Sequence, residues 1–115
     1  MMRGKVVLLP FPFDDFSAMK VRPAVCLTNP VGRHRHVIVA FITSQIPDEI
    51  LDSDLVLRVD HGDFGGTGLR VDSTFRLHRL ITIAASLVKR ELGELSPSLQ
   101  TEISSRLGRL FAVVD

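Results

Sequence analysis

Short apolar runs, each bounded by residues typical of turns, are the feature that most constrains the fold of this chain. Such runs occupy 6–9, 23–28, 36–43 and 54–59, and β-branched residues are frequent in them. Apolar runs of four to eight residues between turn signals are typical of strands. The continuous run at 6–9 predicts a strand buried on both faces, and the long β-branched run at 36–43 predicts a central strand. The first half of the chain should therefore form a sheet.

The second half of the chain continues the β pattern in a weaker form. Residues 73–77 alternate polar and apolar side chains, which predicts a half-exposed strand. Residues 78–83 either extend that strand or form another one. The segment 60–68 is rich in glycine and predicts a connection, and 86–90 predicts a short helical turn.

One clear helix is predicted, at the end of the chain. Ser96 is a good N-cap, and Pro97 follows at the first helical position, where its missing N–H costs nothing. Apolar side chains then recur at helical spacing and form one face: Leu99, Ile103, Leu107 and Leu110. The order of elements predicts a mainly β domain, a small antiparallel barrel or curled sheet with a C-terminal helix.

Length and composition indicate one folded domain spanning 1–115. The chain has 115 residues, of which 45% are hydrophobic and 23% are charged, a balance typical of globular domains. Its formal net charge of +1 neither requires nor excludes nucleic acid. Basic residues gather in 20–35 and 70–90, whereas most acids lie in 48–63 and 91–102. This distribution predicts either a basic face or an ordinary solvated surface.

Cysteine content and hydropathy bear on the compartment. Cys26 is the only cysteine and lies in an apolar run. We therefore expect a core residue, no internal disulfide and a reducing compartment. No apolar stretch approaches the roughly 20 residues of a membrane span, and the N-terminus lacks the pattern of a secretory signal. We expect a cytoplasmic protein with no membrane partner.

The usual metal and cofactor motifs are not found. The histidines have no cysteine or acid at metal-ligand spacing, so no metal is expected. The glycine-rich stretch 62–68 lacks both the dinucleotide spacing and a following lysine with serine or threonine. No cofactor is therefore predicted.

Chemistry concentrates at the ends of two predicted strands. Arg22 stands at the start of one strand, before Pro23, and Thr43, Ser44 and Gln45 end another. A guanidinium and a hydroxyl held on rigid strands can bind a phosphate together. If the two strand ends meet in space, RNA is the predicted substrate.

A loop near these strand ends offers a further cation. Residues 14–17 predict a turn, which starts a polar loop reaching Lys20. From this loop Lys20 would steer a phosphate toward the strand ends. The same loop would act as a lid.

A succession of segments along nearly the whole chain carries a family resemblance. They are 6–13, 20–25, 42–44, 67–70 with Ser73, 80–83 and 92–96. In this order they closely resemble the MazF/PemK-like toxin family. The resemblance implies an SH3-like barrel with a C-terminal helix, acting as a homodimer. It also implies a metal-independent endoribonuclease that cuts single-stranded RNA at a short sequence, and a cognate antitoxin whose disordered tail blocks the RNA groove.

The resemblance assigns two catalytic residues. The arginine of the family's Arg-Pro pair falls on Arg22, and the threonine of its Ile-Thr pair falls on Thr43. Relatives often carry an acid near position 78, so His78 is a departure. It would alter base preference, shuttle a proton, or do neither.

Metal-free cleavage of RNA can use the substrate's own 2′-OH as nucleophile, which leaves 2′,3′-cyclic phosphate and 5′-OH ends. Arg22 would stabilise charge on the phosphate, and Thr43 would donate one hydrogen bond to it. Arginine is a poor base at neutral pH, whereas histidine has a suitable pKa. The residues predicted to contact RNA are Lys20, Ser44, Gln45, Arg76, His78 and Arg79.

A different class of function stays open. The same fold occurs in toxins that bind DNA gyrase, so a non-catalytic protein-binding toxin is an alternative. A degenerate relative that only binds an antitoxin is another. The presence of both Arg22 and Thr43 favours the nuclease.

Overall fold

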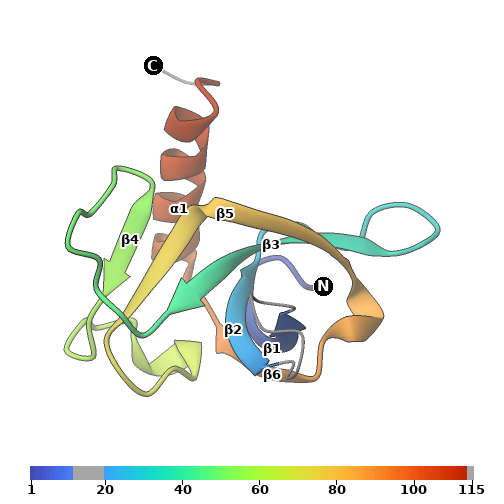
Figure 1. Cartoon of the computed structure of the whole chain (residues 1–115), viewed down its shortest axis with the longest axis horizontal. Helices are drawn as coiled ribbons and strands as arrows, with labels where there is room; N and C mark the ends of the chain where they lie inside the picture. The colour runs from blue at the N-terminus through green and yellow to red at the C-terminus, as the bar shows by residue number, and fades with distance from the viewer. Residues whose placement is uncertain (12–19, 114–115) are drawn as a thin grey trace.

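A curled antiparallel sheet with one long helix packed against it forms the domain (Figure 1). The computed structural model describes residues 1–11 and 20–113. Six strands are ordered β4-β5-β3-β2-β1-β6 across the sheet. They are β1 (Lys5–Phe11), β2 (Lys20–Cys26), β3 (His36–Thr43), β4 (Asp54–Leu57), β5 (Ser73–Ala84) and β6 (Arg90–Glu94). The helix α1 spans Pro97–Leu110, and two short 3₁₀ turns are η1 (Gly65–Thr67) and η2 (Ala85–Leu87). The predicted fold class, mainly β with a C-terminal helix, is confirmed.

Most predicted elements are found where the sequence placed them. The run 36–43 is β3, and it lies inside the sheet between β2 and β5. The run 54–59 gives the shorter strand β4, while 73–83 forms the single long strand β5. The predicted turn at 14–17 lies outside the described residues, but Lys20, which was placed in the loop after it, begins the strand β2.

The segment after β5 differs from the prediction. The helical turn expected at 86–90 is the 3₁₀ turn η2, which ends at Leu87. The strand β6 follows directly and pairs antiparallel with β1, and it was not predicted. The glycine-rich connection at 60–68 contains the short turn η1.

Buried side chains line both faces of the sheet. One cluster includes Val6 of β1 and Phe75 of β5, together with Leu99 and Ile103 of α1. The other includes Val7 and further residues of β1, β2 and β3: Leu9, Ala24, Cys26, Val37 and Val39. Because neighbouring residues of β1 enter opposite clusters, the prediction of a strand buried on both faces is confirmed.

The helix begins as predicted. Ser96 is extended, and its Oγ accepts a hydrogen bond from the backbone N–H of Leu99 at 3.2 Å. Leu99 and Ile103 are buried, and Leu107 packs at the edge of their cluster. Leu110, the last member of the predicted apolar face, is 40% exposed. The helix runs past the edge of the core there, since α1 lies against β5 and its C-terminal end projects beyond the sheet (Figure 1).

A large irregularity in β5 shapes the surface near the end of β3. Ala40 pairs with Leu80, but the next residue, Phe41, pairs with Arg76. Residues 77–79 therefore have no partner in β3 and form a bulge. A bulge changes the direction in which side chains point, and this one carries Arg79.

No helix in the described part of the chain is long and apolar enough to cross a membrane.

Candidate nucleic-acid interface

A cleft of about 860 Å³ opens where the ends of β2 and β3 meet the segment after η1 and the strand β6. Its cationic lining residues are Lys20, Arg22, Arg70, Arg79 and Arg90. Apolar side chains such as Leu8, Phe41 and Leu92 complete the lining. Among the described residues that line it there is no aspartate or glutamate. The cleft is therefore suited to a polyanion.

Arg22 and Thr43 both line this cleft. Ala24 of β2 lies opposite Phe41 of β3 in an antiparallel register. The pairing of β2 with β3 ends there, and Arg22 and Thr43 each lie two residues further along their strands, where both line the cleft. The sheet on either side supports them, because Arg22 pairs with Leu9 of β1 and Thr43 with Thr74 of β5.

The corner after β3 is held by side-chain hydrogen bonds. The Oγ1 of Thr43 accepts a hydrogen bond from the backbone N–H of Gln45 at 3.1 Å. The Oγ1 of Thr74 donates to the carbonyl of Gln45 at 2.9 Å. The hydroxyl hydrogen of Thr43 is thus left to donate elsewhere. Ser44 and Gln45 are exposed and line the same cleft, where both were predicted to contact a ligand.

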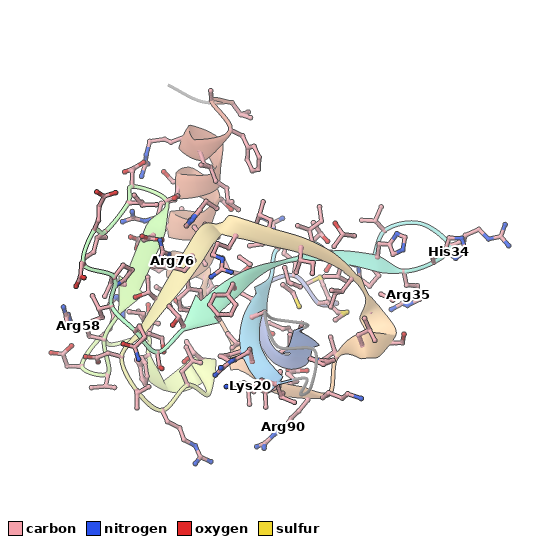
Figure 2. The ribbon with its side chains drawn as sticks, viewed as in Figure 1. Lys20, His34, Arg35, Arg58, Arg76 and Arg90 are labelled. Carbon is pink, nitrogen blue, oxygen red and sulfur yellow. The ribbon has the colours of Figure 1, made fainter. Side chains whose placement is uncertain are left out.

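Most cations of the cleft have no acidic partner among the described residues. Within residues 1–11 and 20–113, no ion pair involves Lys20, Arg22, Arg70 or Arg90. Arg79 lies over the ring of Phe41, with its Cζ 4.8 Å from the ring centroid. Figure 2 shows Lys20 and Arg90 toward the same end of the sheet, far from the protruding hairpin between β2 and β3 that carries His34 and Arg35. Charges gathered without counter-charges attract an anionic ligand and are screened by salt.

Two predicted contact residues lie outside the lining of the cleft. The Nε of Arg76 is 2.9 Å from Oδ1 of Asp54, whose side chain has no exposed surface. The Nδ1 of His78 is 4.0 Å from the same oxygen. Arg76 thus has a structural partner, and RNA contact by either residue stays a prediction. The other predicted residues line the cleft together: Lys20, Arg22, Thr43, Ser44, Gln45 and Arg79.

Two lining cations were not among the predicted site residues. Arg70 follows the turn η1, and Arg90 begins β6. The sequence placed both in its basic segments, but only the pairing of β6 with β1 shows that Arg90, opposite Leu8, reaches the cleft. The missed strand therefore explains the missed residue.

Cys26 is a core residue, as predicted. It is 1% exposed, and burial raises the pKa of its thiol to about 11. A protonated, buried thiol is a poor nucleophile. In the described part of the chain, no group of three or more His, Cys, Asp or Glu side chains is placed to hold a metal ion.

A family model described as "PemK-like, MazF-like toxin of type II toxin-antitoxin system" matches residues 2–111. The chain belongs to this family. No curated protein sequence is significantly similar to it.

Solved structures of PemK- and MazF-like proteins share the fold over nearly the whole chain. The Mycobacterium tuberculosis toxin MazF-mt6 is 23% identical, with a TM-score of 0.71 over 94% of this chain and 96% of that one. A mycobacterial endoribonuclease in complex with its cognate antitoxin is 15% identical, with a TM-score of 0.75 over 100% and 98%. MazF from Deinococcus radiodurans is 16% identical, with a TM-score of 0.66 over 97% and 96%. At these identities the likeness shows the fold.

Proposed function

We propose that this chain is a metal-independent endoribonuclease, the toxin of a type II toxin–antitoxin pair, and that it cleaves single-stranded RNA at a short sequence. The observation that supports this best is that Arg22 and Thr43 line the same cleft, together with four further cations. Membership of the toxin family and the endoribonuclease among the structural neighbours agree with it. A protein that only binds another protein has no need of this pair in a cationic cleft.

The chemistry begins with the substrate's own 2′-OH. Its oxygen attacks the adjacent phosphorus, a bond from O2′ to phosphorus forms, and the bond from phosphorus to O5′ breaks. The 2′ proton is lost, and O5′ gains a proton as it leaves. The products carry 2′,3′-cyclic phosphate and 5′-OH ends.

Arg22 and Thr43 stabilise the negative charge that grows on the phosphate oxygens. The planar guanidinium of Arg22 can donate two parallel hydrogen bonds to them. The hydroxyl of Thr43 donates a third, since its oxygen already accepts from Gln45. Removing one such donor typically costs about 2.7–4 kcal/mol of transition-state stabilisation.

Few of the described cleft residues suit the two proton transfers. The part of the cleft lining that the structure describes contains no histidine and no carboxylate. Arg22 is a poor base, because guanidinium pKa values exceed about 12. In this proposal the 2′ proton passes to solvent, and electrostatic stabilisation supplies most of the catalysis.

The same cleft accounts for the proposed partners. A cationic surface that binds RNA would also bind an acidic segment, so a cognate antitoxin would inhibit by occupying it. Solved neighbours include MazE-MazF structures from Deinococcus radiodurans. We further propose a homodimer that works in the cytoplasm.

The test is cleavage of a mixed-sequence RNA by purified protein in EDTA, with the product ends mapped. We expect 5′-OH and cyclic phosphate ends, and a loss of about 10²–10³-fold in rate for Arg22→Ala and for Thr43→Ala. Arg33→Ala is the matched control, because Arg33 is exposed outside the cleft lining. If folded, antitoxin-free protein leaves the RNA intact, the proposal is wrong, and inhibition of DNA gyrase should be measured next.

A further inference from the structure

Arg79 is held in an unusual way for an exposed cation in a binding cleft. Its Cζ lies 4.8 Å from the centroid of the Phe41 ring, within the range of a cation–π contact. Both residues line the cleft. Long arginine side chains usually sample many rotamers, and ordering them on binding costs free energy. Contact with the ring reduces that cost, because it holds the guanidinium before any ligand arrives.

The backbone explains why the two residues meet. Phe41 lies on β3, one residue after the register shift, and Arg79 lies in the bulge of β5 at 77–79. Arg79 directly precedes Leu80, which pairs with Ala40, so Arg79 and Phe41 are neighbours across the two strands at the point where the register shifts. The ring of Phe41 is anchored as well, since it packs against the buried cluster that includes Val39 and Ala24. The platform beneath Arg79 is therefore half-buried and supported by the core.

We propose that Phe41 and Arg79 form a guanine subsite that helps to set which RNA sequence the cleft accepts. This rests on the proposed function of the cleft. Phe41 covers one face of the guanidinium, which leaves its N–H edge to donate to a base. Arginine donates two parallel hydrogen bonds to O6 and N7 of guanine, whereas adenine presents a donor in place of O6.

Single-stranded RNA suits this arrangement. Its bases are not stacked in a duplex, so their Hoogsteen edges are open to side chains. The other four cations of the cleft have no ring beneath them in the described residues and are suited to phosphates. Phosphate contacts position the strand, whereas base contacts specify it. Arg79 thus has the specifying role.

The test is binding, measured apart from cleavage. Fluorescein-labelled nonauridylate is compared with the same strand carrying guanine, adenine or 7-deazaguanine at its centre. All sugars are 2′-fluoro, which cannot attack the phosphate. We expect the strand with guanine to bind about 5- to 150-fold more tightly than the strand with adenine, because a bidentate base contact typically contributes about 1–3 kcal/mol of discrimination. The strand with 7-deazaguanine, a base that lacks N7, should bind only slightly more tightly than the strand with adenine.

Three variants separate the subsite from general charge. Arg79→Lys keeps the charge but loses the planar fork, so it should bind nonauridylate nearly as well as the wild type and no longer prefer guanine. Phe41→Leu removes the ring and should weaken the preference with no change of charge. Arg90→Ala is the matched control, because it removes a cleft cation and should weaken all strands equally.

The outcomes that contradict the proposal differ from those that contradict the ribonuclease. Equal binding of guanine and adenine by the wild type, or an unchanged preference in Arg79→Lys, would overturn the guanine subsite alone. Equal weakening of every strand in Arg79→Lys would show that Arg79 only stacks or attracts, and would also overturn it. Failure of the wild type to bind any of the strands would overturn both proposals together.

Discussion

Asp54 of β4 places its fully buried carboxylate 2.9 Å from the guanidinium Nε of Arg76, its partner in β5. Its other oxygen accepts a hydrogen bond from the backbone N–H of Leu51 at 2.9 Å. Neither Asp54 Oδ1 nor Arg76 Nε has a well-aligned hydrogen-bond partner among the described residues, so charge holds them together. The pair joins the edge strand β4 and the loop before it to the rest of the sheet.

Loss of Arg76 should therefore destabilise the fold. Arg76→Met leaves the Asp54 carboxylate buried without a counter-charge, which typically costs about 3–5 kcal/mol. Urea unfolding followed by circular dichroism measures the change. The double variant Asp54→Asn/Arg76→Met removes both charges and keeps the acceptor for Leu51, so it should recover most of the loss. A single variant as stable as the wild type would show that the pair contributes little.

Gly93 should not tolerate a side chain. A Cβ on Gly93 would lie 2.3 Å from the carbonyl oxygen of Gly66 and 2.5 Å from the carbonyl carbon of Thr67, both in the turn η1. Gly93→Ala should push η1 away from β6, at a cost of about 1–3 kcal/mol or more. Because Gly68, Leu69 and Leu92 line the cleft next to this contact, RNA binding should weaken as well.

The control for that change is Gly62→Ala. A Cβ on Gly62 meets no atom within 4 Å. The thermal midpoint of the Gly62→Ala variant and its affinity for RNA should therefore stay close to those of the wild type. If the two variants behaved alike, the close approach of η1 and β6 would not be what limits position 93.

The cap of α1 should contribute measurably to stability. Besides accepting from Leu99, Ser96 donates its Oγ hydrogen to Oδ2 of Asp63 at 2.9 Å, which ties the helix to the glycine-rich connection. Ser96→Ala should cost about 1 kcal/mol. Ser98→Ala, at an exposed helical position, should be nearly neutral in the same urea titration. Equal effects of the two substitutions would rule out a special role for the cap.

The fold was largely predictable because its signals are local. The N-cap at Ser96 and the run that forms β3 need only a few adjacent residues to be recognised. The strand β6 could not be predicted, because Arg90–Glu94 holds two glutamates and a glycine, which are poor strand formers. It is a strand because β1 offers it a partner, and that pairing is not local in the sequence.

The residues of the candidate site also differ in how far local sequence predicts them. Arg22 and Thr43 could be predicted because each stands at a recognisable strand end. The contact of Arg79 with Phe41 depends on the pairing of β3 with β5, which joins residues distant in the sequence and which no local pattern marks. Arg76 appeared to be another surface cation, because the burial of Asp54 beside it arises only from tertiary packing.

Salt should weaken RNA binding in proportion to the number of cations that contact phosphate. For single strands, log Kobs falls with log salt at a slope of about −0.7 per phosphate neutralised, so four phosphate contacts would give a slope of about −2.8. Arg90→Ala should make the slope shallower by about 0.7, and Arg33→Ala should leave it unchanged. Titrations of a 2′-fluoro strand at several salt concentrations measure both. A slope near zero would mean that the cleft does not bind the RNA backbone.

The buried thiol of Cys26 should report on unfolding. Since burial raises its pKa from 9.0 to about 11, the folded state holds the thiol proton more tightly than the unfolded state. The contribution of this group to stability is therefore fully present below pH 9 and declines as the pH rises toward about 11. Cys26→Ala should lose less free energy of unfolding between pH 8 and pH 10.5 than the wild type, and urea unfolding at the two pH values measures this.

At pH 8 the Cys26 thiol should react with Ellman's reagent only at the rate at which the protein opens. Rapid reaction in the folded state would contradict its burial between β1 and β3.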